Sequence, residues 1–286
     1  MEEKYAGRKW FYDWRELDRR FEETEVQSLV ERYSEQYANQ TNHWNNELHS
    51  EWTCRMFLAA KLIMSATLHV NSAHFAFEGN NRVVVPYLRY YAALCLMRAL
   101  CLTLPHVRWD DGKLITISHK AAIRETTEYI RRLNGVSSNS INAQIRELKA
   151  ERELLSYRAP SVGDDQVTEK NHEFESLLVL LAECAQLNSE VFEQSLSKRI
   201  AGRNFELLED YAYKVMSVEL EGTFYDDNED AYRFGRMIRK NTSPCNLMFM
   251  MQEGHVDDFF GAWKDENDRA GVFDPDSMTG IIFDIP

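Results

Sequence analysis

The sequence predicts a mainly α-helical protein built from long helices, and three observations support this. The chain has only 12 glycines and 6 prolines in 286 residues, so backbone breakers are scarce. Apolar residues recur at the three- and four-residue spacing of an amphipathic helix in most long segments. Hydrophobic residues make up 44% of the chain, enough for a packed core. We expect a helical bundle, with minor strands only over residues 113–117 and 280–285.

The N-terminal part of the chain predicts five helices in succession. Each shows apolar residues at helical spacing, as Leu17, Leu29 and Tyr33 do in the first. Pro86 suits the first turn of the third helix, and Ser118 is a typical N-cap for the fourth. A polar segment, residues 136–140, is expected to separate the last two. The predicted helices cover 15–37, 47–77, 87–104, 118–133 and 141–157.

A linker signal divides the chain just beyond its middle. The segment from Ser161 to Asp165 directly follows Pro160 and contains one glycine and two aspartates. We therefore predict a helical bundle over 1–160 and an acidic helical region over 161–286 that packs on it, with one continuous domain as the alternative. Helices in the second region are predicted over about 174–196, 205–215 and 229–240.

Charge is unevenly distributed along the chain. With 33 basic and 46 acidic residues, the net charge is −13, which excludes a generally cationic nucleic-acid coat. Residues 80–160 are nevertheless basic, whereas the chain after residue 161 is acidic. Two interpretations of the basic middle remain open: it pairs with acidic parts of the same chain, or it forms a surface for anions or RNA.

Location and cofactor class follow from what the sequence lacks. The N-terminus has no apolar signal core, and the weakly charged stretch 62–77 is too short and polar to span a bilayer. Five cysteines without metal-ligand spacing are typical of a reducing cytosol. No dinucleotide, phosphate-loop or zinc motif occurs. We therefore expect a cytoplasmic protein without membrane contact, metal or cofactor.

Arg98 is the one charged residue in an otherwise apolar helical stretch from Tyr90 to Leu104. A helix that is apolar all round is a buried helix, and a buried guanidinium must be paired or hydrogen-bonded. One interpretation is an arginine that bonds carbonyls or a core carboxylate. The other places Arg98 at a cleft, facing an anionic substrate.

The histidines are the best candidates for acid–base chemistry. His119 opens a predicted helix, where the helix dipole disfavours its cationic form and leaves a neutral ring suited to act as a base. An ordinary surface histidine is the alternative. His106 lies at the other end of the same loop. His69 and His74 are five residues apart, which does not fit one helical face, and we interpret them as core or interface residues.

Several short motifs follow one another within residues 50–160. They are Tyr90-Tyr91-Ala92 with Arg98-Ala99-Leu100, then Ser118-His119-Lys120 at a helix start, and an Arg-rich helix ending in Tyr157-Arg158. This series resembles the HEPN-type helical domains of prokaryotes. The resemblance implies a helical bundle, a homodimer, and binding of RNA or a protein partner in phage defence or a toxin–antitoxin system.

The resemblance also implies candidate site residues. The family's ribonuclease signature, Arg followed by His after four to six residues, is absent, because seven residues separate Arg98 from His106. A metal-independent catalytic site would then arise by tertiary contact, with His119 as base, Arg98 as charge stabiliser and His106 or Tyr90 as acid. The expected ligand-binding residues are Arg89, Arg124, Arg158 and Lys120. The alternative is a non-catalytic interaction protein that docks partners on its acidic C-terminal third.

Overall fold

The computed structural model shows a mainly α-helical fold. It describes residue 5 and residues 14–161, 171–200, 203–240, 243–244, 246–251, 254–265 and 271–282. The chain is 75% helical, and its described part contains 11 α-helices and one small two-stranded sheet. The predicted fold class, a bundle of long helices, is therefore confirmed.

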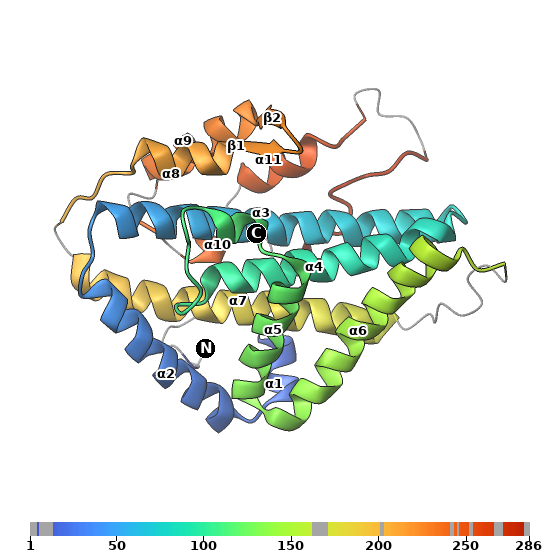
Figure 1. Cartoon of the computed structure of the whole chain (residues 1–286), viewed down its shortest axis with the longest axis horizontal. Helices are drawn as coiled ribbons and strands as arrows, with labels where there is room; N and C mark the ends of the chain where they lie inside the picture. Colours follow the sequence, from blue (N-terminus) through green and yellow to red (C-terminus); the bar gives the residue numbers. More distant parts are fainter. Residues whose placement is uncertain are drawn as a thin grey trace.

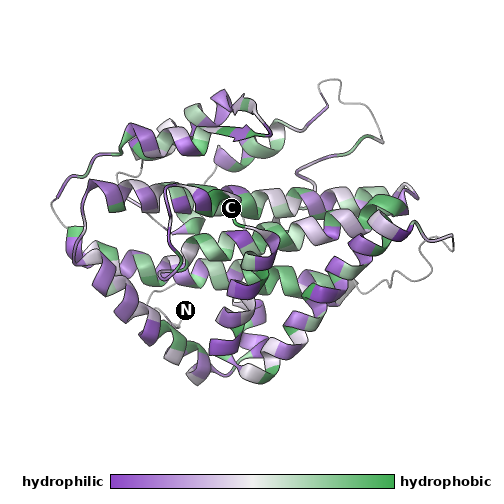
Figure 2. Cartoon of the chain, in the orientation of Figure 1, coloured by the Kyte–Doolittle hydropathy of each residue, from purple (hydrophilic) through white to green (hydrophobic). Residues whose placement is uncertain are grey.

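Three long helices form the middle layer of the molecule. They are α3 (Asn46–Glu78), α4 (Val85–Thr103) and α7 (Asn171–Ile200), and they run roughly side by side in Figure 1. Helix α4 packs against both of the others. Trp52 of α3 stacks on Phe192 of α7, with ring centroids 4.2 Å apart. Hydrophobic residues are concentrated in this layer, whereas α2 and α6 have long hydrophilic faces (Figure 2).

A second group of helices lies below this layer in Figure 1. It consists of α1 (Arg15–Arg20), α2 (Glu23–Thr41), α5 (His119–Leu133) and α6 (Gly135–Arg158). The single helix predicted over 15–37 is two helices, because Phe21 is extended and Glu22 starts α2 with a capping box to Glu25. The predicted separator 136–140 is also wrong. Asn134 ends α5 and caps α6 at once, since its side chain accepts the N–H groups of residues 136 and 137.

The third group lies above α3 in Figure 1 and contains the C-terminal elements. Helix α10 is the exception, since it packs between α3 and α7. The elements of this part are α8 (Glu209–Met216), β1 (Ser217–Leu220), β2 (Thr223–Asp226), α9 (Asn228–Lys240), α10 (Leu247–Met250), α11 (His255–Gly261) and the 3₁₀ turn η3 (Thr279–Ile281). Two further 3₁₀ turns, η1 (Arg82–Val84) and η2 (Lys113–Thr116), flank α4.

The strand positions predicted from the sequence differ from those observed. Residues 113–116 form η2, because the left-handed turn ending at Gly112 (φ 89°) continues into consecutive tight turns. Residues 280 and 281 belong to η3, and residues 283–285 lie outside the described residues. The antiparallel pair is β1 with β2, joined by Glu221 and Gly222, both with positive φ as a type I′ turn requires.

One hydrophobic core extends across the predicted boundary at residue 160. Helix α7 packs against α1, α2 and α4, and residues from Leu17 to Ile282 belong to the same core cluster. The centre of α7 is also polar: Glu183, Asn188 and Glu190 are buried. Asn188 donates to Thr103 of α4 and accepts from Tyr129 of α5. These buried hydrogen bonds connect α7, which follows the predicted linker, to α4 and α5, which precede it.

One stretch within the described residues, Arg82–Thr103, is long and apolar enough to cross a membrane by length and composition alone. In the fold this stretch is η1 and α4, and 67% of its apolar window is buried inside the protein. Its partners are α3 and α7, whose apolar faces cover it. Its hydrophobicity is therefore accounted for by its place in the core.

Candidate functional site

A polar cluster lies where α4, the start of α5 and α6 meet. The hydroxyl of Tyr90 on α4 hydrogen-bonds Nδ1 of His119, the first residue of α5, at 2.9 Å. The ring of Tyr91 meets the imidazole edge to face, with centroids 6.1 Å apart. Lys149 and Arg152 approach from α6. We call these residues, together with Arg98, the Tyr90–His119 cluster.

Positive charge exceeds negative charge in this cluster. The Arg152 guanidinium lies 5.0 Å from the centre of the Tyr90 ring, a cation–π contact. Lys149 and Arg152 share one carboxylate, Glu153, at 3.6 and 3.2 Å. Arg98 donates from Nη2 to the Ile117 carbonyl at 3.1 Å, directly before α5. Among the residues that the structure describes, these three cations therefore have one carboxylate partner, Glu153.

The surroundings keep His119 neutral at physiological pH. Burial lowers the pKa of His119, and the charges of Arg98, Arg152 and Lys149 lower it further. The N-terminus of α5 acts in the same direction. Burial also raises the pKa of Tyr90, so that its hydroxyl stays protonated. The pair offers a neutral imidazole and a phenol, between cations that can hold an anionic group.

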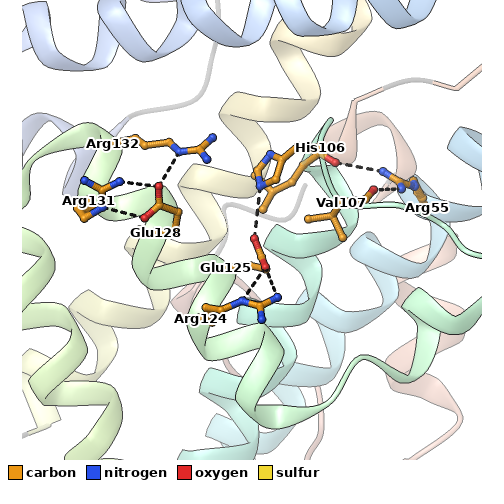
Figure 3. A network of polar contacts seen from close by, with 9 residues as sticks. Arg55, His106, Val107, Arg124, Glu125, Glu128, Arg131 and Arg132 are labelled. Carbon is orange, nitrogen blue, oxygen red and sulfur yellow. Dashed lines mark hydrogen bonds and ion pairs between the residues drawn. The ribbon is translucent and has the colours of Figure 1, made fainter.

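The structure separates His106 from His119. His106 stacks on Tyr33 of α2, with centroids 6.4 Å apart, and its Nε2 lies 3.4 Å from Glu125, further along α5. Figure 3 shows this contact together with Arg124, which pairs with the same Glu125 at 2.7 Å. Of the two acids suggested from the sequence, Tyr90 is the one in contact with His119.

The other predicted ligand-binding residues are dispersed. Lys120 is exposed beside His119, and Arg158 is exposed at the end of α6. Arg89 is buried, with its guanidinium 5.6 Å from the Phe174 ring. It lines a small recess that also contains Glu147 and Glu151 of α6. Arg124 and Arg89 therefore lie beside carboxylates, whereas Arg98 and Lys120 lie at the Tyr90–His119 cluster.

Sequence reasoning missed two cations of the cluster and the most buried arginine of the described chain. Lys149 and Arg152 are three residues apart on α6, a spacing that places both on one helical face. Arg55, only 1% exposed, is the fully buried arginine, a place that the sequence suggested for Arg98. Arg98 is half-buried and bonds a carbonyl. The sequence signal at Arg55 was its position between the apolar residues Trp52 and Met56.

Neither a metal site nor a known relative adds to this picture. Within the described ranges, no group of three or more His, Cys, Asp or Glu side chains could hold a metal ion. Comparison with protein-family models, with curated proteins and with solved structures gives no match. The class defined by the fold and the cluster is a helical-bundle protein with a cationic Tyr–His site.

Proposed function

We propose that this chain is an HEPN-like RNA-binding protein whose Tyr90–His119 cluster holds the phosphate backbone. The observation that carries the proposal is the neutral His119, hydrogen-bonded to Tyr90 within the field of three cations. Phosphate neutralisation by Lys and Arg dominates the affinity of proteins for nucleic acids. A surplus of cations beside aromatic rings is the arrangement that single-stranded RNA requires.

The surface around the cluster supports an extended ligand. Tyr91, 37% exposed, lies next to His119 and offers a ring on which a base can stack. On α6, Ser156 hydrogen-bonds the Tyr87 hydroxyl of α4 at 3.3 Å, so the C-terminal end of α6 meets α4. Tyr157 and Arg158 are exposed in the last turn of α6. A single strand passing over the cluster would meet Lys149 and Arg152 of α6 beside the rings of Tyr90 and Tyr91 of α4.

Binding of a fluorescein-labelled single-stranded RNA of mixed sequence tests this proposal. The double variant Lys149→Gln/Arg152→Gln is expected to bind about tenfold more weakly, because two phosphate contacts are lost. The plot of log affinity against log salt concentration should also become shallower, by about one for each lost contact. Fluorescence anisotropy at several salt concentrations measures both effects.

Arg131→Gln provides the matched control, because Arg131 is an exposed cation of α5 that pairs with Glu128 outside the cluster. This variant should bind RNA as the wild type does. Equal loss in the control and the double variant, or no RNA binding by the wild type, would remove the proposal. Denaturing gels of the same samples test the catalytic assignment: metal-independent cleavage that disappears in His119→Ala supports His119 as the base.

A second function, protein docking, is favoured by the exposed hairpin β1–β2. Leu220 and Tyr225 are half exposed, and the strand register places both on the same face of the hairpin. Exposed carboxylates, Glu219 and Glu221, lie at the turn. An apolar strand edge with an acidic rim suits a basic extended segment of a partner protein.

A peptide of alternating lysine and valine is the probe for this surface. We expect saturable binding of the labelled peptide, measured by anisotropy, and loss of that binding in Leu220→Thr/Tyr225→Thr, which keeps strand propensity but removes the two large side chains of that face. A glutamate–valine peptide should not bind, because the rim is acidic. Equal binding of both peptides would contradict charge-directed docking.

A further inference from the structure

A cavity of about 620 Å³ is lined by α3, α4 and α11. Its floor is a stripe of α3 residues spaced by three or four positions, among them Leu62, Ser65 and His69. Leu88 and Leu102 of α4 form one wall, and Phe259 of α11 with Trp263 forms another. The volume falls in the range of sites for drug-sized ligands.

The charged and polar groups of this cavity are almost all satisfied within the protein. Lys61 is held by Asp227 and Asp230. Ser72 donates to the Leu68 carbonyl at 2.8 Å, and Ser65 accepts the Cys95 thiol at 3.9 Å. The remaining lining is apolar. An anionic ligand would meet no unpaired cation among these residues, and the two aspartates at Lys61 would repel it.

His69 is the exception in the lining. Its ring has no hydrogen-bonding partner in the part of the chain that the structure describes, although it lies half-buried on the cavity floor. Burial lowers the pKa of His69, so the ring is neutral and presents one N–H donor and one acceptor nitrogen. A half-buried imidazole without a partner can therefore bond a hydroxyl or carbonyl oxygen of a bound molecule.

We infer that the cavity binds an uncharged, largely apolar small molecule whose single hydroxyl or carbonyl group bonds His69. The apolar walls provide the affinity, and the one open polar side chain orients the ligand. The inference is independent of RNA binding, because no lining residue belongs to the Tyr90–His119 cluster. It also gives a role to the α3 stripe, whose residues Leu62, Ser65 and His69 are half-buried beside fully buried neighbours such as Ile63 and Ala66.

Pyrene, an uncharged apolar fluorophore, is the first probe. We expect saturable binding to the full chain, with energy transfer from Trp263, which lines the cavity and is 61% exposed. Ser65→Phe, which places a ring on the cavity floor, should weaken pyrene binding about tenfold or more. The matched control is Ser34→Phe, a half-buried position on α2 outside the cavity, which should leave pyrene binding unchanged.

Displacement of pyrene tests the role of His69. Decan-1-ol should displace pyrene from the wild type, and about tenfold more of it should be needed for His69→Leu, which still binds pyrene. Decanoate at pH 8 should displace poorly. Absence of pyrene binding, equal binding by Ser65→Phe, or equal displacement by decanol and decanoate would overturn the inference. So would a dimer in sedimentation experiments that Ser65→Phe dissociates, since a second copy would then occupy the cavity.

Discussion

Replacing Arg55 by methionine is expected to lower the free energy of unfolding by about 3–5 kcal/mol. The guanidinium of Arg55 forms an ion pair with Glu51 at 3.0 Å and donates to the Leu104 carbonyl at 3.2 Å. It also donates to the Val107 carbonyl, as Figure 3 shows. It also lies over the ring of Trp52. Methionine keeps the apolar stem of the side chain. The lost free energy of unfolding therefore measures the cost of leaving two buried carbonyls and the Glu51 carboxylate without their partner.

Chemical denaturation measures this loss, with Arg131→Met as the control. Arg131 is exposed and forms an ion pair with Glu128 at 2.7 Å, so its replacement should leave the free energy of unfolding almost unchanged. The double variant Glu51→Gln/Arg55→Met should be more stable than Arg55→Met. Burial raises the pKa of Glu51, so its charge is unfavourable without Arg55, and glutamine removes that charge. A change of less than about 1 kcal/mol in Arg55→Met would contradict the role assigned to this residue.

Replacing Glu183 by glutamine is expected to abolish a pH dependence of stability between about pH 4.5 and 7. Glu183 is fully buried in α7, and its carboxyl group accepts the backbone N–H groups of Glu16, at 3.0 Å, and Leu17, at 2.7 Å. Burial raises the pKa of Glu183 from 4.5 to about 7, despite these hydrogen bonds, which lower it. Glutamine retains an oxygen that can accept from α1.

The direction of this effect follows from proton binding. Between the two pKa values the folded protein carries a proton on Glu183 and the unfolded chain does not. The native state therefore binds more protons, and the stability contributed by the protonated group is lost as the pH rises through this window. The shift amounts to roughly 3 kcal/mol in the free energy of unfolding.

Denaturation curves at several pH values test this prediction by difference. Wild type and Glu183→Gln should be similarly stable near pH 4.5, and the glutamine variant should be more stable by roughly 3 kcal/mol at pH 8. Glu35→Gln, on the exposed face of α2, should follow the wild type at every pH. Parallel profiles of wild type and Glu183→Gln would show that Glu183 is ionised in the folded protein.

The helices could be predicted from the sequence because their signals are local. Apolar spacing and caps lie within one helix, so Pro86 begins α4 and Ser118 caps α5 as predicted, the latter by accepting the Ala121 N–H. The candidate site was predicted in part. Tyr90, Arg98 and His119 come together, but the pairing of Tyr90 with His119 spans 29 residues and involves no periodic pattern.

Only the tertiary structure determines which charged side chains are buried and which of them contact one another. Arg55 and Glu51, four residues apart, look in sequence like a surface ion pair, and Arg98 looks like the buried arginine. Arg55 is the buried one because α3 packs where the carbonyls of Leu104 and Val107, 49 and 52 residues away, can accept its hydrogens. The sequence by itself determined the helices and their apolar faces. Burial of a charge depends on partners from other helices, so it was decided by packing.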